Sequence, residues 1–485
     1  MRKRIDRARI LGSIAAALCL LGTAVASADD RQGDDNSDPQ DWTTFNYDRL
    51  GTRNNTAEKR LNKHNVAGLH VLWQFNTPAP VTGTPIVVND VVYAGDISGK
   101  FYALTKDGAL LWSFQGSGPV TGSAIYSRGM LVYGDIYGTL YGLKPATGAK
   151  VWSFKPDTNP SAAIYSSAIQ VGKYVVFGIG SNEETYARDP NFPCCSSRGS
   201  VVMLDPKTGA VAWMTPTITD AERATGASGA TVWSSPTYDP QHKLIMVTTG
   251  NNFTAQTTAL SDAFVALDSD TGVIQWVNQR TAGDWWNGRY PFSPANPDWD
   301  FSDSPQVYKV KGRTVVGAGQ KSGFYHVVDA ATGATINQIG LEPSGAIGGL
   351  FADSAVADGV AFINGINWPG AGSGGAPVGG DLFAVSGDGS HVLWEFNTPG
   401  APAMSGVAVA NSVVYFSSMG GNKLYALDQA TGAKLAEVGL GATTTYSGES
   451  GPSVSRGRIY LGTGDAVGLF FQGMPSGGSI TAVGP

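Results

Sequence analysis

Two of the three cysteines in this chain are adjacent, Cys194 and Cys195 in the stretch NFPCCSSRGS. One interpretation is that both are small buried thiols that pack as apolar side chains. The other is a disulfide between neighbours, which an exported protein can keep because its surroundings are oxidising. The pair by itself leaves both interpretations open.

Oxygen-bearing side chains flank these cysteines along the chain. Glu183 and Glu184 lie in GSNEE, Asn251 in TGNN and Asp300 in NPDWDF. Each of them alone is explained as a surface acid or a turn residue. Taken together, carboxylate and amide oxygens are the ligands that Ca²⁺ prefers, so a calcium site is the alternative to separate surface residues, and the residues alone leave both open.

Three residues would add chemistry to such a site. Asp300 stands between two aromatic residues in DWDF, where it is suited to accept a proton, and Lys321 in GQKSG offers a positive charge. Trp233 in VWSSP offers a flat face on which a planar cofactor can stack. The plainer alternatives are a turn-capping aspartate, a turn lysine and a core aromatic. The five histidines show no zinc-ligand spacing.

A repeated hairpin must position these residues. YALTKDGALLWSF, YGLKPATGAKVWSF and VALDSDTGVIQWVN share a strand, a tight turn ending in Gly and a second strand that carries Trp. The candidate residues fall in the longer units of the middle of the chain, as expected of loops on a rigid scaffold. The second-strand position occurs eight times, at Trp73, Trp112, Trp152, Trp213, Trp276, Asn337, Trp394 and Ala436.

The two ends of the chain supply one repeat between them. HVLWQF near the start has no hairpin partner before it, and SITAVGP at the end is a strand without a following Trp. This predicts an all-β, eight-bladed β-propeller over residues 42–485, closed by N- and C-terminal strands in one blade, with each Trp docked on the next blade. A solenoid is the alternative, but its terminal repeats should look like polar caps.

The first 28 residues predict export. A basic head from Arg2 to Arg9 precedes an apolar stretch and Ala26-Ser27-Ala28, which is typical of a signal peptide cleaved after Ala28. The mature protein is then expected in the periplasm or outside the cell, without a membrane span. Residues 29–41 are polar and predict a disordered lead-in. The formal net charge of −6 argues against nucleic acid as a partner.

The order Cys-Cys, Trp, Gly-Asn, Trp-Asp-Phe and Lys-x-Gly on such a propeller resembles the quinoprotein alcohol dehydrogenases, which use pyrroloquinoline quinone (PQQ) and a metal ion. VWSSPTYD, TGNNF and GQKSGFYHVVDAATG are similar to the polyvinyl alcohol dehydrogenase branch, and the similarity covers nearly the whole mature chain. It implies oxidation of alcohols, foremost secondary hydroxyls of polyvinyl alcohol or similar polyols. A quinoprotein for sugars or small alcohols, and a non-catalytic scaffold propeller, are the alternatives.

The resemblance also implies a role for each candidate residue. Ca²⁺ would be held by Glu184, Asn251 and Asp300, with Glu183 as the substitute for Glu184. Asp300 would take the hydroxyl proton, and Asp298 is the next candidate for this base. The residues expected to contact PQQ are the Cys194–Cys195 disulfide on one face, Trp233 on the other face, Arg198 at a carboxylate, Lys321 at the quinone carbonyls, and Ser181.

Three features depart from the family pattern. No Cys-x-x-Cys-His haem motif occurs, so the electrons are expected to leave to a separate cytochrome c or another acceptor. After Gly349 the chain reads LFADS where a Trp-containing stretch is expected. Relatives that prefer lanthanides carry a second Asp two residues after the base, a position that is Ser302 in this chain. Its neutral hydroxyl favours Ca²⁺, and Asp303 should point to the opposite side of an extended chain.

Overall fold

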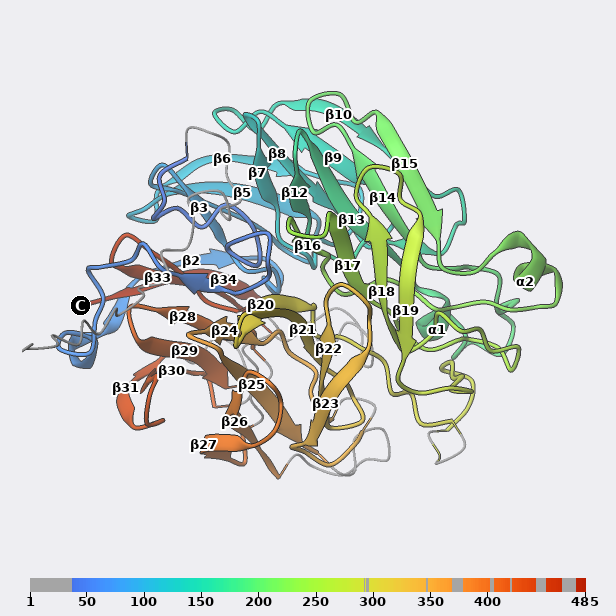
Figure 1. Cartoon of the computed structure of the whole chain (residues 1–485). Coiled ribbons are helices and arrows are strands. Elements are labelled where there is room, and N and C mark those ends of the chain that lie inside the picture. The colour runs from blue at the N-terminus through green and yellow to red at the C-terminus, as the bar shows by residue number, and fades with distance from the viewer. Residues whose placement is uncertain are drawn as a thin grey trace, which may run out of the picture.

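Each repeat of the sequence forms one antiparallel sheet of four strands, called a blade, and eight blades stand around a common centre (Figure 1). The strands of a blade follow one another from the centre to the rim and are named A to D in that order. The computed structural model describes residues 37–485 except 292, 294–295, 346–347, 369–377, 402–404, 419–420, 442–450 and 465–476. The predicted eight-bladed β-propeller is confirmed.

Blades 1 to 4 come first along the chain, and blade 3 carries an additional two-residue strand, β11 (Ala162–Ala163), paired with its B strand. In the order A to D, blade 1 contains β3 (Ile86–Val88), β4 (Val91–Gly95), β5 (Lys100–Thr105) and β6 (Leu110–Gln115), and blade 2 contains β7 (Ile125–Ser127), β8 (Met130–Gly134), β9 (Leu140–Leu143) and β10 (Lys150–Phe154). Blade 3 contains β12 (Ile169–Val171), β13 (Tyr174–Ser181), β14 (Ser200–Leu204) and β15 (Val211–Pro216), and blade 4 contains β16 (Thr237–Asp239), β17 (Leu244–Thr248), β18 (Ala263–Asp268) and β19 (Ile274–Gln279).

Blades 5 to 8 complete the ring, and β1 (Asn54–Asn55) pairs in parallel with the A strand of blade 7. In the order A to D, blade 5 contains β20 (Gln306–Val310), β21 (Arg313–Gly319), β22 (Phe324–Asp329) and β23 (Thr335–Gly340), and blade 6 contains β24 (Ala355–Ala357), β25 (Val360–Asn367), β26 (Gly379–Ser386) and β27 (Val392–Pro399). Blade 7 contains β28 (Ala408–Ala410), β29 (Val413–Ser418), β30 (Lys423–Asp428) and β31 (Lys434–Gly439), and blade 8 contains β32 (Ser453–Ser455), β33 (Arg458–Thr463), β34 (Gly478–Gly484) and β2 (His70–Thr77). Among the described residues the helices are η2 (Val66–Gly68), α1 (Glu183–Tyr186) and α2 (Asp220–Ala224).

Blade 8 joins the two ends of the chain, as the sequence predicts. Its outer strand β2 pairs with the C-terminal β34 from His70 opposite Gly484 to Thr77 opposite Gly478. Figure 1 shows β2 beside β33 and β34, although these strands come from opposite ends of the sequence. Pairing them removes the free sheet edge that an open array of blades would leave.

The Trp of each repeat docks on the next blade. All six Trp residues at the eight repeat positions donate their indole N–H to a carbonyl in the C–D turn of the following blade, as Trp112 does to Pro145 over 2.8 Å. Gly148 in that turn has φ of +69°, and a Cβ there would lie 2.4 Å from the Trp112 ring. The turn therefore needs Gly both for its left-handed backbone and for the space that the ring takes.

Strand position decides the hydrophobic pattern. B and C strands lie between two neighbouring strands and two neighbouring blades, so they are apolar on both sides, and every residue of β17 (LIMVT) is buried. D strands face solvent on the rim and alternate between half-buried and exposed residues, as β2 does. Among the described residues no helix is long and apolar enough to cross a membrane.

An N-terminal segment, residues 40–55, circles the centre of the ring, and we call it the inner strap. It makes a hydrogen bond with the A strand of each blade, or with the residue just before that strand, in the order of the blades. These pairs are Trp42 with Val87, Thr43 with Tyr126, Thr44 with Ala168, Arg49 with Tyr238, Leu50 with Val307, Thr52 with Val356, Arg53 with Val409, and Asn55 with Val454. The strap thus covers the inner sheet edges that face the centre.

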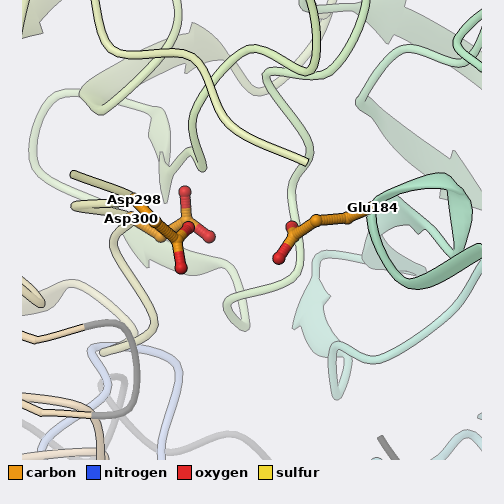
Figure 2. Close-up of side chains that lie close together, drawn as sticks. All are labelled: Glu184, Asp298 and Asp300. Carbon is orange, nitrogen blue, oxygen red and sulfur yellow. The ribbon is translucent and has the colours of Figure 1, made fainter. Parts of the chain in front are cut away.

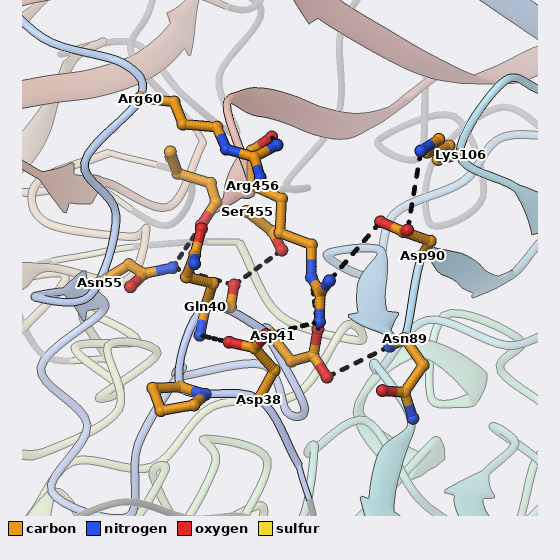
Figure 3. A network of polar contacts seen from close by, with 12 residues as sticks. Asp38, Gln40, Asp41, Asn55, Arg60, Asn89, Asp90, Lys106, Ser455 and Arg456 are labelled. Atoms are coloured by element: carbon orange, nitrogen blue, oxygen red, sulfur yellow. Dashed lines mark hydrogen bonds and ion pairs between the residues drawn. The ribbon is translucent and has the colours of Figure 1, made fainter.

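The two ends of the inner strap meet at blade 8 (Figure 3). The Asn55 amide donates to the Gln40 carbonyl, and the Ser455 hydroxyl in β32 donates to the same carbonyl. Arg456 forms ion pairs with Asp38 at 3.1 Å and with Asp41 at 2.9 Å. The lead-in predicted to be disordered is therefore held from Asp38 onward, whereas the predicted signal peptide 1–28 and residues 29–36 lie outside the described residues.

Strand alternation gives the ring two different faces. Neighbouring strands run in opposite directions, so all A–B and C–D turns lie on one face, the turn face, and all B–C and D–A connections lie on the other, the site face. The candidate residues of the sequence lie in connections of the site face: Glu184, Cys194, Cys195, Arg198, Asn251 and Lys321 in B–C connections, and Trp233, Asp298 and Asp300 in D–A connections.

Candidate functional site

Glu183 and Glu184 are consecutive residues of helix α1, and the structure gives them different surroundings. The Glu183 carboxylate accepts hydrogen bonds from the backbone N–H groups of Ser196 and Ser197, both at 2.8 Å, and from the Ser197 hydroxyl at 2.7 Å. Its oxygens therefore hold the loop that follows the cysteines. Glu184 lies instead beside Asp298 and Asp300. The geometry favours Glu184 over Glu183 as a metal ligand.

Cys194 and Cys195 are joined by a disulfide, and the peptide bond between them is cis. The loop that carries them is fixed at its base, because the Ser181 hydroxyl accepts hydrogen bonds from the Ser197 hydroxyl and from the Glu183 N–H. Ser181 therefore supports the disulfide loop in this structure. Its contact with a cofactor stays a prediction.

Glu184, Asp298 and Asp300 bring three carboxylates together, with one oxygen of each within 4.8 Å of the others. Figure 2 shows Glu184 reaching from α1 toward Asp298 and Asp300, which come from the D–A connection between β19 and β20. Three negative groups at this separation repel one another unless a cation or protons compensate them. The set is the donor chemistry that Ca²⁺ requires.

Burial disfavours the charged form of these acids, and the positive side chains nearby offset this only in part. It raises the pKa of Glu184 to about 7, a rise to which the Asp300 carboxylate adds and which Lys321 and Arg188 oppose. Burial also raises the pKa of Asp298 well above its ordinary value, against the effect of Lys321. The pKa of Asp284 rises to about 6 for the same first reason. A bound divalent cation would reverse these shifts, because it stabilises the ionised carboxylates.

Lys321 is the cation that the structure places among these acids. Its Nζ lies 3.2 Å from Asp298 and 3.1 Å from Asp300, and its backbone N–H donates to the Asp300 carbonyl. Burial alone would lower the pKa of Lys321, but the carboxylates of Asp298, Asp300 and Glu184 raise it above its ordinary value. The side chain is therefore a permanent ammonium at neutral pH.

Asn251 leaves a buried oxygen free beside the acids. Its backbone N–H donates to Asp300, and its side-chain amide donates to the Trp286 carbonyl. Among the described residues its Oδ1 is fully buried and accepts no hydrogen bond. Leaving a buried oxygen unpaired costs about 1–3 kcal/mol. A metal ion at this position would remove that cost, so the residues present fit the predicted ligand set.

Trp233 lies over the ammonium of Lys321, with its ring centre 5.4 Å from Nζ. Gly250 allows the close approach of Trp233 and Asp300, since a Cβ at Gly250 would lie 3.0 Å from Asp300 Oδ1 and 3.1 Å from Trp233 Nε1. Trp233, Asn251, Asp300 and Lys321 are thus brought together from three blades, as the sequence predicts.

Arg198 has its polar partners at the edge of this region. Its Nη1 donates to the Ile218 carbonyl at 2.7 Å and to Asp220 at 2.8 Å, where α2 begins. Its predicted contact with a cofactor carboxylate stays a prediction.

Ser302 and Asp303 differ in the way the sequence suggests. Ser302 is buried, and its hydroxyl has no hydrogen-bond partner among the described residues. Asp303 accepts hydrogen bonds from the N–H groups of Gly319 and Ser354 and from the Ser354 hydroxyl, at 2.7–3.0 Å. Its carboxylate is thus committed to blades 5 and 6 instead of the acidic cluster.

In the sequence, two residues of the site, Asp298 and Phe351, stand out less than they do in the structure. Asp298 appears there only as an alternative base, although its spacing from Asp300 in DWD is a usable signal. Phe351 lies in LFADS, where a Trp-containing stretch is expected. Its ring centre is 5.8 Å from that of Trp233 and 5.9 Å from Lys321 Nζ, so it supplies an aromatic wall from blade 6.

Comparisons with known proteins identify similar chains. The model of a protein family described as outer membrane protein assembly factor BamB matches residues 59–262 and 378–473, which is more than half of the chain. Polyvinylalcohol dehydrogenase from Pseudomonas sp. is 27% identical over 456 residues, covering 84% of this chain and 70% of that protein.

Solved structures share the fold. The quinohemoprotein alcohol dehydrogenase of Comamonas testosteroni superposes with a TM-score of 0.71 and 20% identity, over 91% of this chain and 80% of that one. A europium-containing methanol dehydrogenase gives a TM-score of 0.73 and 18% identity, over 92% of this chain and 98% of that one.

Proposed function

The chain belongs to the PQQ-dependent alcohol dehydrogenase family of oxidoreductases, and on that premise we propose that it oxidises secondary hydroxyls of polyvinyl alcohol or similar polyols with PQQ and Ca²⁺. The observation that carries the proposal is the group of Glu184, Asp298 and Asp300 around Lys321, next to the free oxygen of Asn251. A scaffold propeller would have no use for buried acids that cost stability.

Glu184, Asn251 and Asp300 would hold the Ca²⁺, and Asp298 adds a fourth oxygen donor within reach. Lys321 and Arg188 carry two positive charges against the carboxylates of Glu184, Asp298, Asp300 and Asp284, so a divalent ion improves the charge balance. Asp303 is occupied elsewhere and Ser302 is neutral, so neither adds a carboxylate to the cluster of Glu184, Asp298 and Asp300. The neutral Ser302, at the position where lanthanide-preferring relatives carry Asp, supports Ca²⁺ over a lanthanide.

The residues of the chain divide the work of alcohol oxidation. Asp300 would accept the hydroxyl proton, because its carboxylate is held by Asn251 N–H and Lys321. Lys321, fixed as an ammonium, would stabilise negative charge that develops on an oxygen next to Nζ. Trp233 and Phe351 exclude water on the aromatic side of Lys321. When bound next to these residues, PQQ would supply the redox chemistry of the oxidation and Ca²⁺ would supply Lewis acidity.

The electrons would leave to a separate cytochrome c or another external acceptor, in the periplasm or outside the cell. The adjacent Cys194–Cys195 disulfide supports an oxidising compartment. Mass spectrometry after alkylation without reductant should show neither cysteine modified in the exported protein. Two alkylated cysteines would contradict the proposed disulfide wall of the cofactor site.

Reconstitution tests the function directly. The purified protein is stripped with chelator, supplied with PQQ and either Ca²⁺ or La³⁺, and assayed by dye reduction with polyvinyl alcohol, small secondary alcohols and sugars. We expect Ca²⁺ to restore activity, La³⁺ to add little, and polyols to exceed sugars. Activity with La³⁺ but not with millimolar Ca²⁺ would overturn the metal assignment. If the enzyme prefers sugars or small alcohols to polyols, the proposed polyol substrate is wrong and the protein is instead a quinoprotein for sugars or small alcohols.

A further inference from the structure

Exposed aromatic side chains are unevenly distributed between the two faces of the ring. Among the described residues the aromatic side chains that are more than one third exposed are Tyr137 (42%), Tyr186 (39%), Tyr290 (42%) and Phe324 (39%). All four lie in, or directly after, B–C or D–A connections, on the site face. The exposed residues at the turn-face ends of the D strands are aliphatic instead, Leu111 among them. Large exposed rings grouped on one face of a soluble protein indicate a binding surface.

Contacts between loops join three of these aromatics into one row over blades 2 to 4. The Asn182 amide, at the start of α1, donates to the carbonyl of Ile136 next to Tyr137 at 2.7 Å, and the ring of Tyr186 packs on Phe192 at 5.6 Å. The Phe192 carbonyl accepts a hydrogen bond from Arg289, next to Tyr290.

The row ends in a second ring pair, in which Tyr290 packs on Trp285 at 5.3 Å. We name Tyr137, Tyr186, Phe192, Tyr290 and Trp285 the aromatic row.

The aromatic row starts at the helix that carries a candidate metal ligand. Glu184 and Tyr186 belong to the same turn of α1, so one side chain reaches the acids while the other is exposed at the surface. The Glu184 carbonyl also accepts a hydrogen bond from the Gly288 N–H, which fixes the loop of Tyr290 to α1 at 2.9 Å. Apart from Tyr137, the row therefore lies on the two loops that border the acidic cluster.

From this position we infer that the aromatic row is a docking surface for a long polyol chain, an inference that rests on the proposed function. A chain of alternating CH₂ and CHOH groups is uncharged, so ring faces and phenolic hydroxyls match it better than charged side chains would. Tyr rings pack against the CH groups and their hydroxyls exchange hydrogen bonds with the substrate. A small alcohol bound at the acidic cluster is too short to reach the rings on the neighbouring loops and gains nothing from them.

The test compares polyvinyl alcohol with 2,4-pentanediol, a short piece of the same repeating unit, in the reconstituted holoenzyme. For the double variant Tyr186→Ala with Tyr290→Ala, the ratio of kcat/KM for polymer to that for diol should fall about tenfold, the effect of losing two stacked rings. The matching variant Tyr186→Phe with Tyr290→Phe keeps the rings and should retain most of the ratio. Leu111→Ala, at 52% exposed on the turn face, is the control and should leave the ratio unchanged.

A second readout needs no catalysis. Cofactor-free protein is titrated with polyvinyl alcohol by calorimetry, and the double Ala variant should bind about tenfold more weakly than the wild type. If the polymer binds through the tyrosines but is not oxidised, the proposed substrate is wrong and the docking surface stands. If the polymer is oxidised and the double variant has the wild-type ratio, the proposed substrate stands and the docking surface is wrong. Equal losses for both substrates, or a loss seen only with a protein acceptor and not with dye, would also overturn the inference.

Discussion

The inner strap and the site face differ in whether their buried charged groups have hydrogen-bond partners. Arg53 of the strap is fully buried, and its guanidinium donates to the carbonyls of Val407, Phe45 and Pro452. At the site, Asp262 has both carboxylate oxygens buried without a hydrogen-bond partner among the described residues, and Asn251 Oδ1 is likewise unpaired. A paired buried charge stabilises a fold, whereas buried acids that gather without partners are characteristic of functional sites.

The pKa values reflect the same contrast. Burial lowers the pKa of Arg53 to about 10, opposed by Asp353 and Asp303, so the side chain stays charged at any physiological pH. Burial raises the pKa of Asp262 well above its ordinary value, and Asp284, Asp300 and Asp298 add to the rise. Variants of the strap should therefore cost stability, and variants of the site should cost activity.

The largest effect is expected for Asp300→Asn. The amide keeps an oxygen for the Asn251 N–H but cannot accept a proton, so turnover of the reconstituted enzyme should fall about 10³-fold. Dye reduction measures the rate, and thermal unfolding should show the fold intact. Near-normal turnover would reassign the base to Asp298.

Arg53→Ala should reverse that pattern. Removing the guanidinium leaves buried carbonyl oxygens unpaired and a cavity beside Phe45 and Trp42, so the free energy of unfolding should fall by about 3 kcal/mol. Urea unfolding measures the loss, and turnover per folded molecule should stay close to the wild type. Arg313→Ala, which removes an exposed ion pair with Asp329, is the matched control and should change stability by less than about 1 kcal/mol. Equal losses in the two variants would remove the special role of the strap.

Glu184→Gln tests the acids of the site through pH. The pKa of Glu184 is raised to about 7 from an ordinary 4.5, so its contribution to the stability of metal-free protein is complete below pH 4.5 and is lost as pH rises through 7. The expected decline is on the order of 2 kcal/mol, and the Gln variant should lack it. Thermal unfolding between pH 4.5 and 8, with and without Ca²⁺, measures this. Ca²⁺ should restore stability above pH 7 in the wild type but much less in the variant.

The smallest effect on stability is expected for Cys194→Ala with Cys195→Ala. A bond between adjacent residues constrains the unfolded chain very little, and the loop stays anchored by Glu183, so unfolding should change by about 0.5 kcal/mol. PQQ affinity, measured by titration of the absorbance, should nevertheless weaken about tenfold. An unaltered affinity would remove the disulfide from the cofactor site, and a large loss of stability would make it a structural bond.

The repeat can be recognised in the sequence because the blades share the same turn and the same packing between neighbouring blades. A Gly-containing turn followed by a Trp recurs in most units, with Asn337 and Ala436 at the Trp position of two, and the docking of Trp112 above Gly148 explains why both residue types are needed. The closure by β2 and β34 followed from the incomplete repeats at the two ends. Local chemistry of this kind is encoded within one stretch of residues, so it determines the fold class without reference to the rest of the chain.

Only the tertiary structure decided the remaining assignments, because they depend on groups far apart in sequence. Whether Glu183 or Glu184 faces the acids was settled by the backbone donors of Ser196 and Ser197, which occupy Glu183. The inner strap carries no repeat and binds mostly through backbone groups, which leave no mark on residue type. The aromatic row is likewise assembled from loops of three blades, and in the sequence its members are separate loop aromatics with no common motif.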